Sequence, residues 1–426
     1  MVSIRKRSNF FLADCADRYL AMPSELNDSQ RARRDVVVRA LVVLIAVTIV
    51  LLLFGVLMVF SATSARSIGA VIGDSSGTVF FLTATRHAIW VGISLVIGLA
   101  IVMMPYQWIE RFSYWLLAGA IFLQILVLFI GETINGNKNW LSLGSAVQVQ
   151  PSEFLKVAMI VWLAHALARL TEAEIRSLHT IVIPSIGFIA STAVVLAGRD
   201  MGTGLVYVLI GVGMFWCAGL KNSMIVCLGI LGAFGAAILV AAQPSRFRRV
   251  TDFFFSFLAL PDIDEPTQAE FAQFAFGSGG ISGVGLGAGK EKWRDLAEAH
   301  TDFIYAVIGE ELGLFGTLAV ILLFIMLGWS YVQLAVNMNT RYGQLVVVGV
   351  GIWICGQALA NMCVVTGLLP VFGVPLPFLS QGGSSMLGVL AGNAVVIGCA
   401  FGVPGVKDAF SLKNRMWLRS RAIVKG

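Results

Sequence analysis

Apolar stretches of membrane-spanning length alternate with short polar segments along most of the chain. Each stretch approaches or exceeds the roughly 20 residues that an α-helix needs to cross the hydrocarbon of a bilayer. We therefore predict an all-α polytopic membrane protein with about ten transmembrane helices. The stretches lie near residues 36–61, 87–105, 112–131, 155–171, 180–198, 203–219, 223–243, 303–335, 344–369 and 384–403.

The polar segments divide the chain into a membrane domain and two tails. Residues 36–404 form the predicted membrane domain, which contains a large extracytoplasmic loop at 244–302 between the seventh and eighth helices. The tails, residues 1–35 and 405–426, are rich in lysine and arginine, and such segments stay in the cytoplasm. An even number of spans places both tails on the same side.

Composition supports a membrane protein and adds no sign of another class. The chain is 58% hydrophobic and only 13% charged, about half the charge of a soluble protein, with a mean hydropathy of +0.85. Its six cysteines show neither a disulfide framework nor zinc-ligand spacing. The net charge of +6 fits the bias of cytoplasmic segments toward positive charge and does not indicate a nucleic-acid partner.

The stretch from Gly277 to Gly313 holds the most unusual chemistry. A glycine-rich loop leads to Asp302, and the apolar helix that follows carries Glu310 and Glu311. A carboxylate within a membrane span costs at least ~2.5–3.5 kcal/mol, so it lines a cavity or has a specific partner. Helical geometry predicts that Asp302 and Glu310 face one cavity while Glu311 points elsewhere, with structural anchoring of neighbouring helices as the alternative. The glycine run lacks the spacing of a P-loop or a dinucleotide fingerprint.

Three further external segments carry polar residues beside the spans, and we expect them to converge with the long loop on one site. They are residues 132–154, 199–202 and 370–383. Within the first, Pro151 suits the start of a helix, and Lys156 lies one turn after Glu153, with which it can pair. The last is irregular yet apolar, which at membrane depth requires burial in protein or a cavity. The helix that follows it could receive a phosphate on its free N–H groups or be capped locally.

These motifs together resemble the SEDS family of bacterial membrane glycosyltransferases, and details beside Gly309 and Glu298 are more similar to its FtsW branch than to RodA. The resemblance covers nearly the whole membrane region in the family's order. It rests on GNKNW (136–140), QPSEFLK (150–156), RDMGTG (199–204), GVGLG (283–287), EAHTDFIYAVIGEELG (298–313), GQALAN (356–361) and GLLPVFGVPLPFLSQGGSS (367–385).

The resemblance implies roles for particular residues. Asp302 matches the aspartate that acts as catalytic base, Glu310 matches the glutamate beyond it, and Glu298 is a second supporting carboxylate. The chain departs from the family at Asn139, Gln148 and Gln381, where many relatives have arginine, a basic residue and tyrosine. The expected substrate contacts are Lys138, Trp140, Glu153, Lys156, Lys292, His300, Ser380, Gly382, Gly383 and Ser384.

The function that the resemblance implies is polymerisation of lipid II into glycan strands during cell division, with undecaprenyl pyrophosphate as the leaving group. The implied partners are a class B penicillin-binding protein, which is a transpeptidase, and other divisome proteins in the plasma membrane at the septum. A divalent cation, Mg²⁺ or Mn²⁺, is expected between the carboxylates and the pyrophosphate. The alternative is a lipid II transporter, or flippase, because buried carboxylates and broken helices also occur in transporters.

Overall fold

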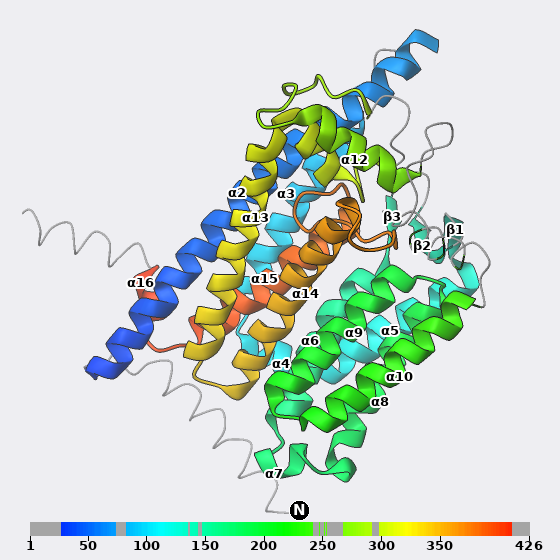
Figure 1. Cartoon of the computed structure of the whole chain (residues 1–426). Helices are drawn as coiled ribbons and strands as arrows, with labels where there is room; N and C mark the ends of the chain where they lie inside the picture. Colours follow the sequence, from blue (N-terminus) through cyan, green and yellow to red (C-terminus); the bar gives the residue numbers. More distant parts are fainter. Residues whose placement is uncertain are drawn as a thin grey trace, which may run out of the picture.

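A computed structural model describes residues 27–73, 82–134, 137–143, 147–241, 247, 251, 253, 267–291 and 298–410 (Figure 1). Most of both predicted tails, much of the long loop and Lys292 lie outside these residues. The elements are α2 (Asp28–Gly73), α3 (Leu82–Met103), α4 (Tyr106–Arg111), α5 (Ser113–Ile130), β1 (Glu132–Ile134), β2 (Asn137–Leu143), β3 (Val147–Val149), α6 (Pro151–Ala168), α7 (Glu172–Ile175), α8 (Leu178–Ala197), α9 (Met201–Ala218), α10 (Asn222–Ala241), α12 (Gln268–Gly279), α13 (Ile304–Asn337), α14 (Arg341–Val365), α15 (Gly383–Phe401) and α16 (Val406–Ala409).

The helical membrane architecture predicted from the sequence is confirmed. Nine helices in the described part of the chain are long and apolar enough to cross a membrane, namely α2, α3, α5, α6, α8, α9, α13, α14 and α15. Helix α10, 20 residues long, occupies the position of the seventh predicted span. The nine helices differ in burial: the most apolar window of α6 is 83% buried, against 17% for α3. Helix α6 therefore lies inside the bundle, and α3 turns most of its surface to lipid.

Outside the membrane helices, residues 132–149 form a small sheet that the sequence analysis did not predict. Strands β1, β2 and β3 are antiparallel and lie in that order. Ile134 pairs with Asn137, so only Asn135 and Gly136 separate β1 from β2. Asn-Gly is the preferred pair for a two-residue hairpin loop, and the strand pairing satisfies backbone groups of a segment that we expected to be a loop.

Helix α13 is broken at Gly313, where the backbone has φ 65° and ψ −157°. The glycine-rich loop after α12 replaces the helical hydrogen bonds that the break removes. The amides of Val284 and Gly285 donate to the carbonyls of Glu310 and Glu311, at 3.0 Å each, and the amide of Leu314 donates to the carbonyl of Gly280. A side chain at Gly313 would collide with the backbone of this loop, so both its φ angle and its contacts require glycine.

The two ends of the molecule differ in charge. The chain enters α2 and leaves α16 at the same end, where Arg33 donates to the Asn339 side chain between α13 and α14. We call this the basic end; its cationic residues are Arg31, Arg33, Arg34, Arg111, Arg169, Arg176, Lys221, Arg341 and Lys407. At the opposite end lie α12, the sheet and the segments that precede α9, α13 and α15 (Figure 1).

Candidate functional site

The segment that leads into α6 contacts the starts of both α9 and α15. The side chain of Gln150 donates to Asp200 Oδ2 at 3.2 Å, and its backbone amide donates to Ser384 Oγ at 3.0 Å. In strand β2, the Lys138 amide donates to the Gly198 carbonyl at 2.9 Å. Three segments far apart in sequence are therefore joined by direct hydrogen bonds, as the predicted convergence requires.

The turn before α13 is bonded to the 370–383 segment, which completes the convergence. The Gln381 amide donates to the His300 carbonyl at 2.9 Å. The hydroxyl of Ser380 donates to the Thr301 carbonyl at 2.6 Å and accepts from the Leu376 amide at 2.7 Å. Ser380, predicted as a substrate contact, thus holds the two segments together through both of its hydrogen-bonding functions.

Asn361 of α14 holds the backbone of Asp302 in position. Its side-chain amide donates to the carbonyls of Asp302 and Val374, at 2.7 Å each. One turn earlier, Gln357 donates to the Pro375 carbonyl at 2.8 Å. The sequence analysis assigned neither side chain to the site, although both belong to the GQALAN motif (356–361). Their spacing of four residues, which places them on one helix face, was the available signal.

Asp302 lies in a negatively charged setting. A Cβ built on Gly373 would be 3.4 Å from Asp302 Oδ2, so the 370–383 segment covers the carboxyl closely. Burial, together with the nearby charges of Glu298 and Asp200, raises the pKa of this carboxyl to about 7. A carboxyl with this pKa exchanges its proton near neutral pH, as a general base requires.

Asp200 was absent from the predicted site residues, yet it is one of the two carboxylates that act on Asp302. It is the N-cap of α9, where it accepts from the Thr203 amide at 2.9 Å and from the Thr203 hydroxyl at 2.8 Å. These bonds, with the one from Gln150, hold its carboxylate in place. The RDMGTG motif marked this turn as important, but separation by about a hundred positions hid its proximity to Asp302.

Strained backbone conformations occur in the segments that converge near Asp302. Three non-glycine residues of the described chain have positive φ angles: Arg199 at 62°, Glu298 at 56° and Phe378 at 65°. Each belongs to a different one of the converging segments. Glu298 accepts a hydrogen bond from the Thr301 hydroxyl at 2.8 Å, which closes the turn that presents Asp302. Non-glycine residues in this region cost about 1–3 kcal/mol each and cluster at functional sites.

The two glutamates of α13 have separate partners. Glu310 accepts from the amides of Lys290 and Glu291, and so anchors the glycine-rich loop. Glu311 accepts from the Ser61 hydroxyl of α2, at 2.7 Å for each oxygen. They point in different directions, as predicted. Oε1 of Glu310 anchors the loop, which is neither of the two predicted roles, while its buried Oε2 has no hydrogen-bond partner among the described residues.

Glu153 and Lys156 form the ion pair that their spacing predicted, at 2.8 Å. Lys156 is 1% exposed, donates to Gln357 Oε1 at 3.3 Å, and lies 4.9 Å from the centre of the Trp353 ring. Its charge is therefore neutralised and enclosed by protein. This geometry makes the pair part of the scaffold beneath the 370–383 segment, and a direct contact with substrate would require opening it.

The remaining predicted residues surround this centre. Lys138 donates through Nζ to the Phe129 carbonyl at 3.3 Å, and Trp140 lies opposite Glu132 in the sheet. Gly382 caps α15, and a Cβ on Gly383 would meet the Trp90 ring at 2.7 Å. Asn139 is 1% exposed and faces Gly198, and its side-chain amide has no hydrogen-bond partner among the described residues.

No cluster of three or more metal-ligating side chains occurs in the described residues. A cation at this site would therefore need ligands from the substrate as well as from Asp302 and its neighbours. Repulsion among the carboxylates of Asp302, Glu298 and Asp200 favours such a shared cation, because oxygen-rich, negatively charged settings suit Mg²⁺.

The fold and the site define a polytopic helical membrane protein whose candidate active centre is an aspartate at one end of the bundle. Residues 41–400 match the model of the FtsW, RodA and SpoVE family of cell cycle proteins, and the chain belongs to this family. It is 35% identical over 361 residues to stage V sporulation protein E of Bacillus subtilis, covering 83% of this chain and 95% of that protein. It is 37% identical over 347 residues to the probable peptidoglycan glycosyltransferase FtsW of Allochromatium vinosum, covering 79% and 84%.

Solved structures share the fold. The chain is similar to one from a study of the structural coordination of polymerization and crosslinking by a peptidoglycan synthase complex, with a TM-score of 0.66 and 22% identity over 85% of this chain and 97% of that one. It is also similar to the rod shape determining protein RodA of Thermus thermophilus, with a TM-score of 0.62 and 22% identity over 85% and 96%. At these identities the likeness establishes the architecture.

Proposed function

We propose that this protein is a peptidoglycan glycosyltransferase that polymerises lipid II into glycan strands during cell division. The family match supports the class of reaction, and relatives at 30–37% identity are named probable peptidoglycan glycosyltransferase FtsW. The observation that carries the proposal is the Asp302 carboxyl, held by four converging segments with a pKa of about 7.

The reaction needs one proton acceptor. A sugar hydroxyl attacks the anomeric carbon of a second lipid-linked sugar, a new glycosidic C–O bond forms, and the C–O bond to pyrophosphate breaks. Asp302 takes the proton of the attacking hydroxyl, and undecaprenyl pyrophosphate leaves as an anion. Asn361 and Ser380 hold the turn that carries Asp302, so the base meets the hydroxyl in one orientation.

The location of the site suits a substrate that is partly lipid. The polyprenyl tail stays in the membrane, the sugars extend into water, and the pyrophosphate lies at the boundary. There the start of α15, at Gly382, Gly383 and Ser384, offers backbone N–H groups and the positive end of a helix dipole. Lys138 of β2 and Lys292, which lies outside the described residues, are the proposed cationic contacts.

We further propose that a divalent cation, Mg²⁺ or Mn²⁺, binds between Asp302, its neighbouring carboxylates and the pyrophosphate. Such an ion would stabilise the negative charge that develops on the leaving group. The proposal is supported by the negative charges of Glu298 and Asp200 beside Asp302, because Asp302 forms no salt bridge with a described residue.

Charge distribution supports an orientation with the basic end in the cytoplasm and the Asp302 site outside. In that orientation the site faces the compartment where a class B penicillin-binding protein would crosslink the strands. The complex structure named above, which couples polymerization with crosslinking, supports such a partner. A location at the division septum with other divisome proteins follows from the FtsW naming of relatives.

A lipid II transporter is the second candidate, favoured by the broken helix α13 and the buried glutamates. Against it, the break at Gly313 and the irregular 370–383 segment both lie at the end opposite the basic end. Transporters pair such segments across two halves around a site at the membrane midplane. The arrangement therefore favours an enzyme at one surface.

The two candidates are separated by incubating purified protein with labelled lipid II, its transpeptidase and Mg²⁺, and resolving the products on a gel. An enzyme yields a ladder of glycan chains. Parallel vesicles with lipid II in the inner leaflet report its movement to the outer leaflet. Movement without any polymer would reject the glycosyltransferase and support the transporter.

A further inference from the structure

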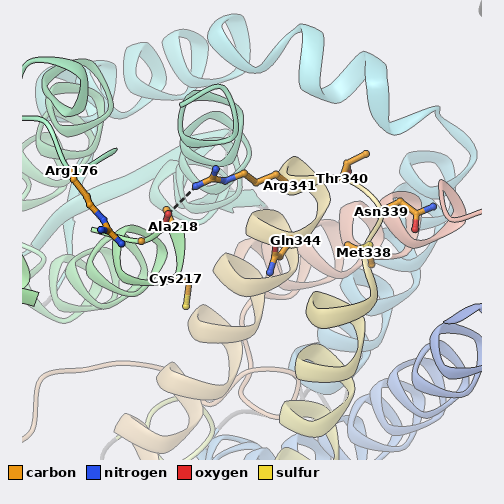
Figure 2. A pocket seen from close by; sticks show the side chains of 9 residues that line it. Arg176, Cys217, Ala218, Met338, Asn339, Thr340, Arg341 and Gln344 are labelled. Atoms are coloured by element: carbon orange, nitrogen blue, oxygen red, sulfur yellow. Dashed lines mark hydrogen bonds between the residues drawn. The ribbon is translucent and has the colours of Figure 1, made fainter. Parts of the chain in front are cut away.

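A polar cavity of about 480 Å³ lies at the basic end, on the far side of the molecule from Asp302. This volume is in the usual range of small-molecule sites, about 300–1,000 Å³. It lies where the turn before α8, the end of α9 and the α13–α14 connection meet (Figure 2). Its lining residues are Arg176, Cys217, Ala218, Gly219, Met338, Asn339, Thr340, Arg341 and Gln344.

The two arginines of the lining differ in what they already bind. Arg341 donates to the Leu170 carbonyl at 3.0 Å and to the Ala218 carbonyl at 2.9 Å, so it closes the ends of α6 and α9. The side chain of Arg176 is exposed and has no hydrogen bond or ion pair with any described residue. Figure 2 shows them on opposite sides of Ala218. One guanidinium is fixed by the fold, and the other is available to a ligand.

Three further features of the cavity favour an anion. The lining contains no carboxylate. Arg33 of α2 donates to Asn339 Oδ1 at 3.0 Å, which adds a third guanidinium at the rim. The 25-residue helix α14 begins in the lining at Arg341, so the positive end of its dipole faces the same space. Thr340 and Gln344 add exposed polar groups beside it.

The cavity lies at the level of phospholipid headgroups, because its residues stand at the ends of membrane spans. Helices α9 and α13 end at Ala218 and Asn337, and α14 begins at Arg341. Trp216, which directly precedes Cys217 of the lining, is 63% exposed, and tryptophan is enriched at membrane interfaces. Basic pockets between transmembrane helices at this level bind anionic headgroups.

We propose that this cavity binds the phosphate group of an anionic phospholipid, held between Arg176 and Arg341. Arg341 supplies a guanidinium already oriented by two carbonyls, and Arg176 closes on the phosphate from the opposite side. The polar groups of Asn339 and Gln344 face the glycerol part of the headgroup. The site is separate from the one proposed for glycosyl transfer, since its lining contains no residue of the segments that surround Asp302.

The test compares lipid retention by the full chain in native mass spectrometry, using phosphatidylglycerol and phosphatidylcholine. Arg176→Gln removes the available guanidinium without touching a structural bond. Arg111→Gln removes an exposed arginine at the same end that does not line the cavity. We expect wild type and Arg111→Gln to retain phosphatidylglycerol over phosphatidylcholine, and Arg176→Gln to bind it about fivefold more weakly, the effect of one arginine near an anionic surface.

A competition arm identifies the source of the phosphate. Unchanged phosphatidylglycerol retention in millimolar inorganic phosphate, together with the Arg176 effect, assigns the cavity to a lipid. Displacement of the lipid by inorganic phosphate would overturn the lipid assignment in favour of a soluble phosphate ligand. Equal retention by wild type, Arg176→Gln and Arg111→Gln would overturn the site itself.

Discussion

Two carboxylates, the buried Glu153 and the half-buried Asp302, show how neighbours give the same chemical group opposite roles. Glu153 is paired at 2.8 Å with Lys156, and both side chains are enclosed. Asp302 forms no salt bridge with a described residue and instead lies near the negative charges of Glu298 and Asp200. The first carboxylate is neutralised and holds helices together. The second has a pKa of about 7 and can accept a proton near neutral pH.

The two regions are connected through one face of α14. Lys156 donates to Gln357, whose amide donates to the Pro375 carbonyl. Asn361, one turn further, bonds both Val374 and Asp302. The Glu153–Lys156 pair and its partners on α14 thus support the strained turn that presents Asp302. Packing around the pair offsets the free-energy cost of the strained backbone.

The largest expected effect is on catalysis at Asp302. Asp302→Asn keeps the shape of the side chain but cannot accept a proton, so polymerisation of lipid II should fall about 10²–10⁴-fold. Ionisation of the folded Asp302 costs stability as pH rises from its unfolded pKa near 4 through about 7. The variant should therefore melt at or above the wild-type temperature at pH 8, and this difference should vanish toward pH 4. A lower melting temperature at pH 8 would mark Asp302 as structural.

Lys156→Met should mainly lower the stability of the protein, whereas Asp302→Asn should mainly lower its activity. Removing one member of a buried ion pair leaves an uncompensated charge and costs about 3–5 kcal/mol. Thermal unfolding in detergent measures this loss. The double variant Glu153→Leu with Lys156→Met removes both charges and should recover most of it. If the single variant is as stable as wild type and fails only to bind lipid II, then Lys156 contacts the substrate directly.

Asn361→Ala should lower kcat about 10–100-fold, because the turn that carries Asp302 loses its main support and reaction geometry tolerates little displacement. The loosened turn also lets water reach Asp302, so the acid limb of the pH profile should move below pH 7. Asn361→Gln, which keeps the amide, serves as the matched partial rescue. A lower kcat with an unmoved pH limb would show that Asn361 acts on packing alone.

The pH dependence of the wild-type protein should follow ionisation of Asp302. The base works only when deprotonated, and its pKa is about 7. Activity should therefore be on a plateau above pH 8 and fall about tenfold for each unit below pH 7. Initial polymerisation rates between pH 5.5 and 8.5 measure this limb. An ordinary aspartate, by contrast, would leave the rate flat down to pH 5.

The smallest effect is expected at Lys138, the proposed substitute for the arginine that many relatives have at Asn139. Its Nζ is held only by the Phe129 carbonyl, and Asn139 itself faces inward. Lys138→Ala should raise KM for lipid II a few-fold and leave kcat nearly unchanged, as loss of ground-state binding does. Equal kinetics in the two proteins would make Lys138 a solvated loop charge.

Local patterns in the sequence determined the membrane spans, the pairing of Glu153 with Lys156, and the divergence of Glu310 from Glu311. These depend on helix periodicity, which is known from the residues themselves. The candidate base, Asp302, came from a motif at a helix start.

Only the tertiary structure decided which groups surround that base. Asp200 and Asn361 reach Asp302 from other helices, and no sequence spacing encodes contacts between such distant segments. The break at Gly313 and the loop partners of Glu310 also depend on packing, because a broken helix is stable only where another backbone supplies its hydrogen bonds.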